Sequence, residues 1–99
     1  MKAMSIFAVE YVYNPDHDHL RAEHRPAHRQ WLEGLVGDGR VLASGPFADG
    51  TGALLLFASA TEADLNQLVS EDPFAQAGAI SAVKTTAWNP VIGTFRDLV

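Results

Sequence analysis

Two residues of this 99-residue chain, His28 and Asp72, have the types needed to move a proton together. A carboxylate bonded to one nitrogen of an imidazole fixes the tautomer of the ring, and the other nitrogen is then free to accept or donate a proton near neutral pH. The alternative is a structural His–Asp bond that anchors the loop before the last strand. From the spacing alone the structural bond is favoured, because structural pairs also perturb titration.

Three further positions could contact a substrate. Ser44 could donate a hydrogen bond, and the neighbouring Gly45-Pro46 would let a ligand or backbone approach closely. Arg25, about one helical turn before His28, could hold a carboxylate or a phenolate. Each position also has a structural interpretation, a bend at a strand end or a solvated arginine, and taken alone those interpretations are favoured.

The four histidines raise the possibility of a zinc site. His24 and His28 stand four residues apart, as in helical zinc sites, but Pro26 between them argues against a regular helical pair. The chain has no cysteine to complete such a site. We therefore expect no metal and no cofactor, with His17 and His19 in a polar loop at the entrance to a site.

The composition favours a globular domain and argues against several other classes of protein. A chain of 99 residues with 47% hydrophobic residues is expected to form a single globular domain over residues 1–99, with residues 90–99 as a C-terminal tail. The net charge of −5 and the absence of a basic cluster argue against nucleic-acid binding. No apolar run approaches the ~18 residues of a membrane span. The lack of cysteine is compatible with a cytoplasmic location.

Hydrophobic periodicity and turn signals locate the elements that must position these residues. Proline is best tolerated in the first turn of a helix, which places the start of the first helix near Pro26 and leaves residues 16–24 as loop or an imperfect turn. Its inner stripe is expected to hold His28, Trp31, Leu32 and Leu35, and its outer face Arg29, Gln30 and Glu33. The other predicted elements are strands over 5–13, 40–47, 53–59 and 79–88, a second helix capped by Thr61 and a helical turn over 74–78.

The order β-α-β-β-α-β predicts an α+β, ferredoxin-like sandwich. Two helices would cover one face of the sheet, yet the strand over 53–59 is apolar on both faces. A sheet that is apolar on both sides must be covered on both sides. We therefore expect a homodimer in which two sheets pack face to face, with Trp31 and Trp88 as core or interface anchors.

The sequence also resembles the YciI-like (YCII-related) family. The resemblance rests on four segments in order, which are His24–Leu32, Leu42–Phe47, Glu71–Gly78 and Val83–Trp88. It implies a dimeric α+β barrel built from ferredoxin-like subunits. It also implies an active site in which a His and an Asp correspond to His28 and Asp72, with an arginine at Arg25 and a Gly-Pro motif at Gly45-Pro46.

One activity known in that family is the dehydrochlorination of a chlorinated hydroxyhydroquinone, which implies small aromatic or lactone-like substrates. The leading hypothesis is therefore a cofactor-independent isomerase or lyase. In it His28 is the general base, Asp72 orients the ring, and Arg25 and Ser44 hold a developing oxyanion. The alternative hypothesis is a non-catalytic ligand-binding or accessory dimer that uses the same pocket.

Overall fold

The computed structural model describes residues 4–98. The strands are β1 (Ser5–Tyr13), β2 (Val41–Pro46), β3 (Gly52–Ser59) and β4 (Ile80–Trp88). The helices are α1 (Asp18–Gly37), α2 (Glu62–Val69) and α3 (Pro73–Gln76), with 3-10 turns at Pro15–His17 and Arg96–Leu98. The predicted order of elements is confirmed, and the helical turn expected before the last strand is α3.

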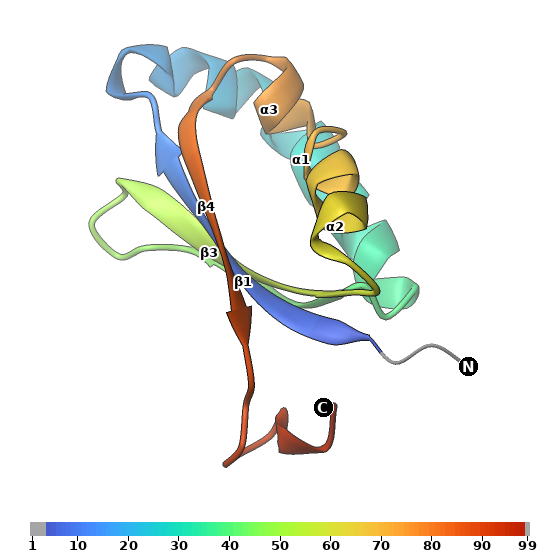
Figure 1. Cartoon of the computed structure of the whole chain (residues 1–99). Helices are drawn as coiled ribbons and strands as arrows, with labels where there is room; N and C mark the ends of the chain where they lie inside the picture. The colour runs from blue at the N-terminus through green and yellow to red at the C-terminus, as the bar shows by residue number, and fades with distance from the viewer. Residues whose placement is uncertain (1–3, 99) are drawn as a thin grey trace.

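The four strands form one antiparallel sheet in the order β2-β3-β1-β4. All three helices cover the same face of this sheet, and the segment after β4 runs to the opposite side (Figure 1). This is the predicted ferredoxin-like α+β arrangement. No helix in the described part of the chain combines the length and apolar character that crossing a bilayer requires.

Alternate residues of the two central strands face the helices and build the core. Phe7, Val9 and Tyr11 of β1 face the helices and are almost completely buried. Their partners across the sheet, Phe57, Leu55 and Ala53 of β3, are buried with them. Burying a side chain of this size contributes about 1.5–3 kcal/mol relative to leaving it exposed. The helices complete the core with Leu35, Leu65, Leu68 and Val69, and Trp31 packs against it.

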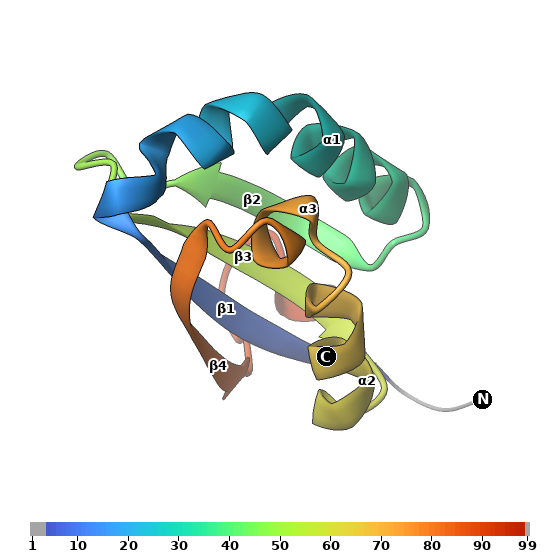
Figure 2. The same ribbon diagram turned by 90° about the horizontal axis from the view of Figure 1, so that it is seen from above.

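Helix α1 differs from the prediction at its start. It begins at Asp18, eight positions before Pro26, so that Pro26 lies inside the helix. Proline has no N–H to donate to the carbonyl of Ala22, four residues earlier, and its ring crowds that turn. The helix arches over the sheet (Figure 2), as helices containing a proline commonly do. The preceding 3-10 turn is capped by the Asn14 side chain, which accepts a hydrogen bond from the Asp16 N–H.

A bulge in β2 decides which of its side chains face the helices. Val41 pairs with Phe57, but the register shifts before Ala43, and Ser44 then pairs with Leu55. Because side chains of paired residues share a face, Val41 and Ser44 both face the helices although three positions separate them. Strand β2 lies at an edge of the sheet and ends at Pro46, as predicted.

The face of the sheet away from the helices retains exposed apolar side chains. Val12 of β1 is 50% exposed, Leu54 of β3 is 39% exposed, and Trp88 of β4 is 40% exposed. In the tail, Val91 and Ile92 are 71% and 88% exposed. Trp88 thus lies outside the core of this single chain, whereas Trp31 is packed against the core.

Candidate active site

The His28 side chain is bonded to Asp72, the partner expected from the sequence. Nδ1 of His28 lies 2.7 Å from Oδ1 of Asp72. The Asp72 residue is completely buried, whereas the His28 side chain is 12% exposed. Asp72 adopts the extended conformation that the following proline favours, and its side chain caps α3 by accepting a hydrogen bond from the Phe74 N–H at 2.9 Å.

A third residue, Tyr11, completes the set around Asp72. Its hydroxyl donates a hydrogen bond of 2.7 Å to Oδ2 of Asp72. Burial raises the pKa of the Tyr11 hydroxyl, and the charge of Asp72 and their hydrogen bond raise it further. Tyr11 therefore stays neutral and remains a donor at any physiological pH. The sequence analysis missed this role, although a tyrosine on the buried face of a strand normally needs a hydrogen-bond partner.

These contacts fix the tautomer of His28. A carboxylate that accepts bonds from Tyr11, from the Phe74 N–H and from His28 requires the proton of the neutral imidazole to be on Nδ1. The lone pair is then on Nε2. The ring is also held from one side, because it stacks on the Phe74 ring with centroids 3.8 Å apart and planes 4° from parallel. The imidazole is thus oriented, with one nitrogen available.

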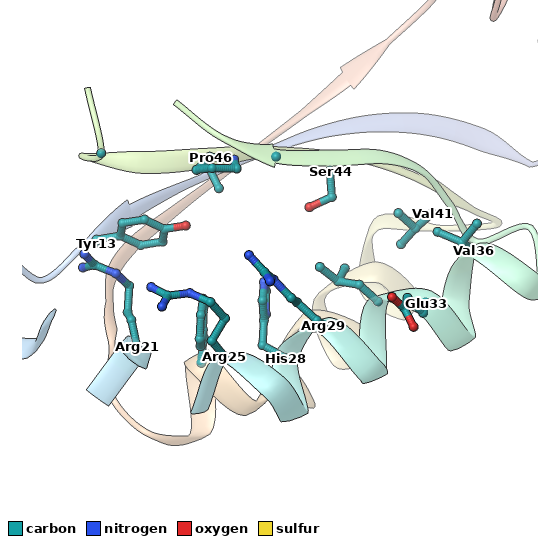
Figure 3. Close-up of a pocket in the computed structure, with 15 residues that line it drawn as sticks. Tyr13, Arg21, Arg25, His28, Arg29, Glu33, Val36, Val41, Ser44 and Pro46 are labelled. Carbon is teal, nitrogen blue, oxygen red and sulfur yellow. The ribbon is translucent and has the colours of Figure 1, made fainter. Parts of the chain in front are cut away.

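His28 lines a cavity of about 480 Å³ between α1 and β2 (Figure 3). Cavities of this size hold small organic ligands. The remaining walls come from the end of β1, the loop between β2 and β3, the start of β3 and α3. The lining residues are Tyr13, Arg21, Arg25, His28, Arg29, Leu32, Glu33, Val36, Val41, Ser44, Gly45, Pro46, Gly50, Ala53 and Phe74.

Every site residue expected from the sequence lies in or directly behind this cavity. Arg25, Ser44, Gly45 and Pro46 line it together with His28, and Asp72 lies behind the imidazole. The bulge in β2 brings Ser44 to the helix-facing side, opposite α1 (Figure 3). The structure therefore brings together segments that are far apart in the sequence.

Two of the arginines in the cavity wall were not anticipated, Arg21 and Arg29. Arg29, expected on the outer face of the helix, lines the cavity instead, as does Glu33. Arg21, Arg25 and Arg29 recur every four residues and so lie along one flank of α1. A helix that starts near Pro26 leaves Arg21 in the preceding loop, so the predicted helix does not contain this periodicity.

Arg21 already has partners within the protein. Its guanidinium forms an ion pair of 3.0 Å with Asp18 and lies 4.1 Å from the centre of the Tyr13 ring. Burial raises the pKa of the Tyr13 hydroxyl, although the charges of Arg21 and Arg25 act in the opposite direction. Tyr13 thus remains a neutral hydroxyl at the end of the cavity.

The remaining histidines do not gather around one point. His17 is bonded through Nδ1 to the Gly78 carbonyl at 2.9 Å, and His24 lies 3.8 Å from the neighbouring Glu23. Over residues 4–98, no group of three or more His, Cys, Asp or Glu side chains is arranged to hold a metal ion. Contrary to the expected entrance loop, His19 and His24 belong to α1.

Comparisons with solved structures agree with this fold. The chain is similar to 5-chloro-2-hydroxyhydroquinone dehydrochlorinase (TftG) from Burkholderia phenoliruptrix AC1100, solved in complex with 2,5-dihydroxybenzoquinone. The TM-score is 0.76 and the identity 24%, over 85% of this chain and 93% of the dehydrochlorinase.

Two further solved structures are similar at lower identity. A Bacteroides thetaiotaomicron protein, provisionally named as an antibiotic biosynthesis monooxygenase, has a TM-score of 0.59 and 15% identity over 91% of both chains. Rv0793 from Mycobacterium tuberculosis has a TM-score of 0.55 and 12% identity over 92% of this chain and 98% of its own. At these identities the three structures support the fold alone.

A comparison with curated protein sequences gives no match. The model of the YCII-related domain, in contrast, matches residues 5–89. That range includes β1 through β4 and every residue of the His28 site described above. The protein therefore belongs to the family of YCII-related domain proteins.

Proposed function

We propose that this protein is an enzyme that moves protons on a small aromatic or lactone-like molecule without a cofactor. In this proposal Nε2 of His28 is the general base, and Asp72 keeps the ring in the required tautomer. Arg25 and Ser44 stabilise the oxyanion that develops when the proton leaves. The reaction is either an isomerisation, in which His28 returns the proton at another atom, or a lyase reaction that eliminates HCl.

The observation that carries this proposal is the asymmetry of the His28 surroundings. One ring nitrogen is bound to a buried carboxylate, and the ring itself lines a cavity large enough for a substrate. A base within a cavity and a fixed tautomer are the requirements for general base catalysis, which typically contributes 10²–10⁴-fold to the rate. Arg25 and Ser44 approach the same cavity from opposite walls, where they could contact a substrate oxygen (Figure 3).

The lyase form of the reaction has a simple balance. A hydroxyl proton first moves to the ring carbon that carries chlorine, which gives a keto tautomer. His28 then takes a proton from a second hydroxyl, the electrons of that O–H bond form a C=O bond, the adjacent ring double bond shifts, and the C–Cl bond breaks to release chloride. The proton then leaves His28 for solvent, so that one HCl is lost in each turnover. The similarity in fold to a dehydrochlorinase supports testing this form first.

We also propose that the working unit is a homodimer. The exposed Val12, Leu54 and Trp88 lie on the face of the sheet that the helices leave open. A second copy packed on that face would remove these side chains from water. Light scattering at micromolar concentration tests this proposal, and a stable monomer would contradict it.

The second candidate function is a ligand-binding or accessory dimer without turnover. The structural role of Asp72 favours it, because this carboxylate accepts hydrogen bonds from β1, from α1 and from the start of α3. A residue with that role would be retained even if His28 never accepted a substrate proton.

One experiment distinguishes the enzyme from the accessory protein. The protein is incubated with 5-chloro-2-hydroxyhydroquinone and with a panel of hydroxylactones, and chloride release and proton exchange with D₂O are followed by ion chromatography and NMR. Thermal stability is measured in parallel, because binding to the folded state alone raises it by mass action. Conversion of any compound supports the enzyme. Thermal stabilisation without conversion of any bound compound supports the accessory function.

A further inference from the structure

The cavity has a charge opposite to that of the whole chain. The protein carries a net charge of −5, with only seven lysines and arginines. Three of those seven, Arg21, Arg25 and Arg29, line the cavity, against one acidic lining residue among those described, Glu33. A cationic cavity on an anionic protein concentrates anions and repels cations, so the charge itself selects for a negatively charged ligand.

The three arginines are not equivalent. Arg21 is held by Asp18 and by the Tyr13 ring, as described above. Arg25 and Arg29 form no ion pair with any acidic side chain among residues 4–98. Their side chains extend from α1 towards the space in front of β2 (Figure 3). Two guanidinium groups therefore remain for a ligand.

The proposed reaction accounts for one of these two groups. A single oxyanion develops during proton transfer, and Arg25 with Ser44 is assigned to it. Arg29 follows His28 directly in the sequence and lines the same cavity, yet it has no task in that reaction. We propose that Arg29 binds a carboxylate that the substrate carries in addition to its reacting group. This inference rests on the proposed function and makes Arg29 a specificity-determining residue.

The walls of the cavity favour a carboxylate over a phosphate. Phosphate sites commonly use the N–H groups at the start of a helix or a glycine-rich loop. This cavity is bounded by α1, by a β-hairpin and by Phe74 near the start of α3, and the Phe74 N–H is already bonded to Asp72. The planar fork of an arginine matches the two oxygens of a carboxylate and binds it with two parallel hydrogen bonds.

The test compares two probes that differ only in the carboxylate. Hydroquinone and 2,5-dihydroxybenzoate share the ring and the hydroxyl groups, and their affinities are measured by isothermal titration calorimetry at constant ionic strength. The benzoate is expected to bind at least tenfold more tightly to the wild-type protein. In Arg29→Gln that preference is expected to fall roughly tenfold, while Arg29→Lys, which keeps the charge but loses the fork, retains part of it.

Two controls accompany these variants. Arg40→Gln removes an exposed arginine that lies outside this cavity, and it should leave the preference for the benzoate unchanged. Inorganic phosphate serves as a third probe. Equal affinity for the two ring compounds, an Arg29→Gln variant that behaves like wild type, or phosphate binding tighter than the benzoate would overturn the inference.

The His28→Gln variant distinguishes failure of this inference from failure of the proposed function. This variant removes the proposed base and should still prefer the benzoate within about twofold of wild type, because the carboxylate contacts Arg29. A preference that depends on Arg29 in a protein with no turnover would support the inference and contradict the enzyme. Turnover of neutral compounds without any preference for carboxylates would support the enzyme and contradict the inference.

Discussion

Nδ1 of His28 and Oδ1 of Asp72 lie 2.7 Å apart, although 44 residues separate them in the chain. The bond joins the middle of α1 to the start of α3, and Tyr11 extends it to the central strand β1. One buried carboxylate therefore links three elements, and the imidazole at its end lines the cavity. The same contact thus contributes to the fold and positions the group proposed to carry the chemistry.

The Tyr11→Phe variant tests the buried hydrogen bond from Tyr11 to Asp72. Removing the hydroxyl leaves Oδ2 of the buried Asp72 without its donor, which costs about 1–3 kcal/mol of the free energy of unfolding. Urea denaturation measures this loss. Tyr13→Phe is the matched control, since the Tyr13 hydroxyl makes no hydrogen bond with the described residues, and it should change stability by less than about 0.5 kcal/mol. Equal losses in both variants would show that the Tyr11 bond is unimportant.

The stability at alkaline pH should report the same residue. The pKa of Tyr11 is raised in the folded protein above its ordinary value of 10.0, so above that pH the unfolded chain releases a proton that the folded protein keeps. The contribution of Tyr11 to stability is then fully present below about pH 10 and falls by up to about 1.4 kcal/mol per pH unit above it. Unfolding curves at pH 9, 10 and 11 measure this slope. In Tyr11→Phe the slope should be shallower, and an unchanged slope would contradict the assignment.

Ser44→Ala probes the proposed oxyanion contact. Because charge develops on the substrate oxygen only in the transition state, loss of this donor should lower kcat by roughly tenfold to hundredfold and leave KM nearly unchanged. Steady-state kinetics with a compound that the wild type converts gives both constants. Ser81→Ala, which changes an exposed serine of β4 that does not line the cavity, is the control. A rise in KM at constant kcat would assign Ser44 to substrate binding alone.

The proposed dimer is tested on the open face of the sheet with Leu54→Lys. Leu54 pairs across the sheet with Glu10, so a lysine there gains an opposite charge as neighbour and the fold should tolerate it. The same lysine would be buried between two sheets in the dimer, at a cost that should dissociate it. Sedimentation velocity is expected to show a dimer for the wild type and a monomer for the variant.

Val83→Lys is the matched control for that experiment. Val83 is 45% exposed and pairs with Tyr11, which places it on the helix-facing side of the edge strand. It should leave the association state unchanged. A wild-type protein that sediments as a monomer would contradict the proposed dimer, as would a Leu54→Lys variant that remains dimeric.

Much of the fold was predictable because its local signals are strong. The alternation along β1, the turn residues between β2 and β3, and the Thr61 cap of α2 each act over a few residues. The His28–Asp72 pair was also predictable, because His28 shares a helical stripe with apolar residues and the predicted topology places Asp72 on the same face of the sheet. The family resemblance favoured the same pair independently.

The rest depends on contacts that a sequence does not display. Pro26 favours a helix start, but the helix begins at Asp18, and in its first turn Arg21 pairs with Asp18 and lies over the Tyr13 ring of β1. That extension is what brings Arg21 to the cavity. No glycine marks the bulge before Ala43 in the sequence, although this bulge places Ser44 on the side of the sheet that faces the site. Both are tertiary effects on a locally ambiguous segment.

Chloride release and proton exchange in His28→Gln show whether His28 is the base. With 5-chloro-2-hydroxyhydroquinone or any other compound that the wild type converts, turnover is expected to fall at least 10²-fold, with an unchanged circular dichroism spectrum. Turnover by His28→Gln within a few fold of the wild type would contradict it.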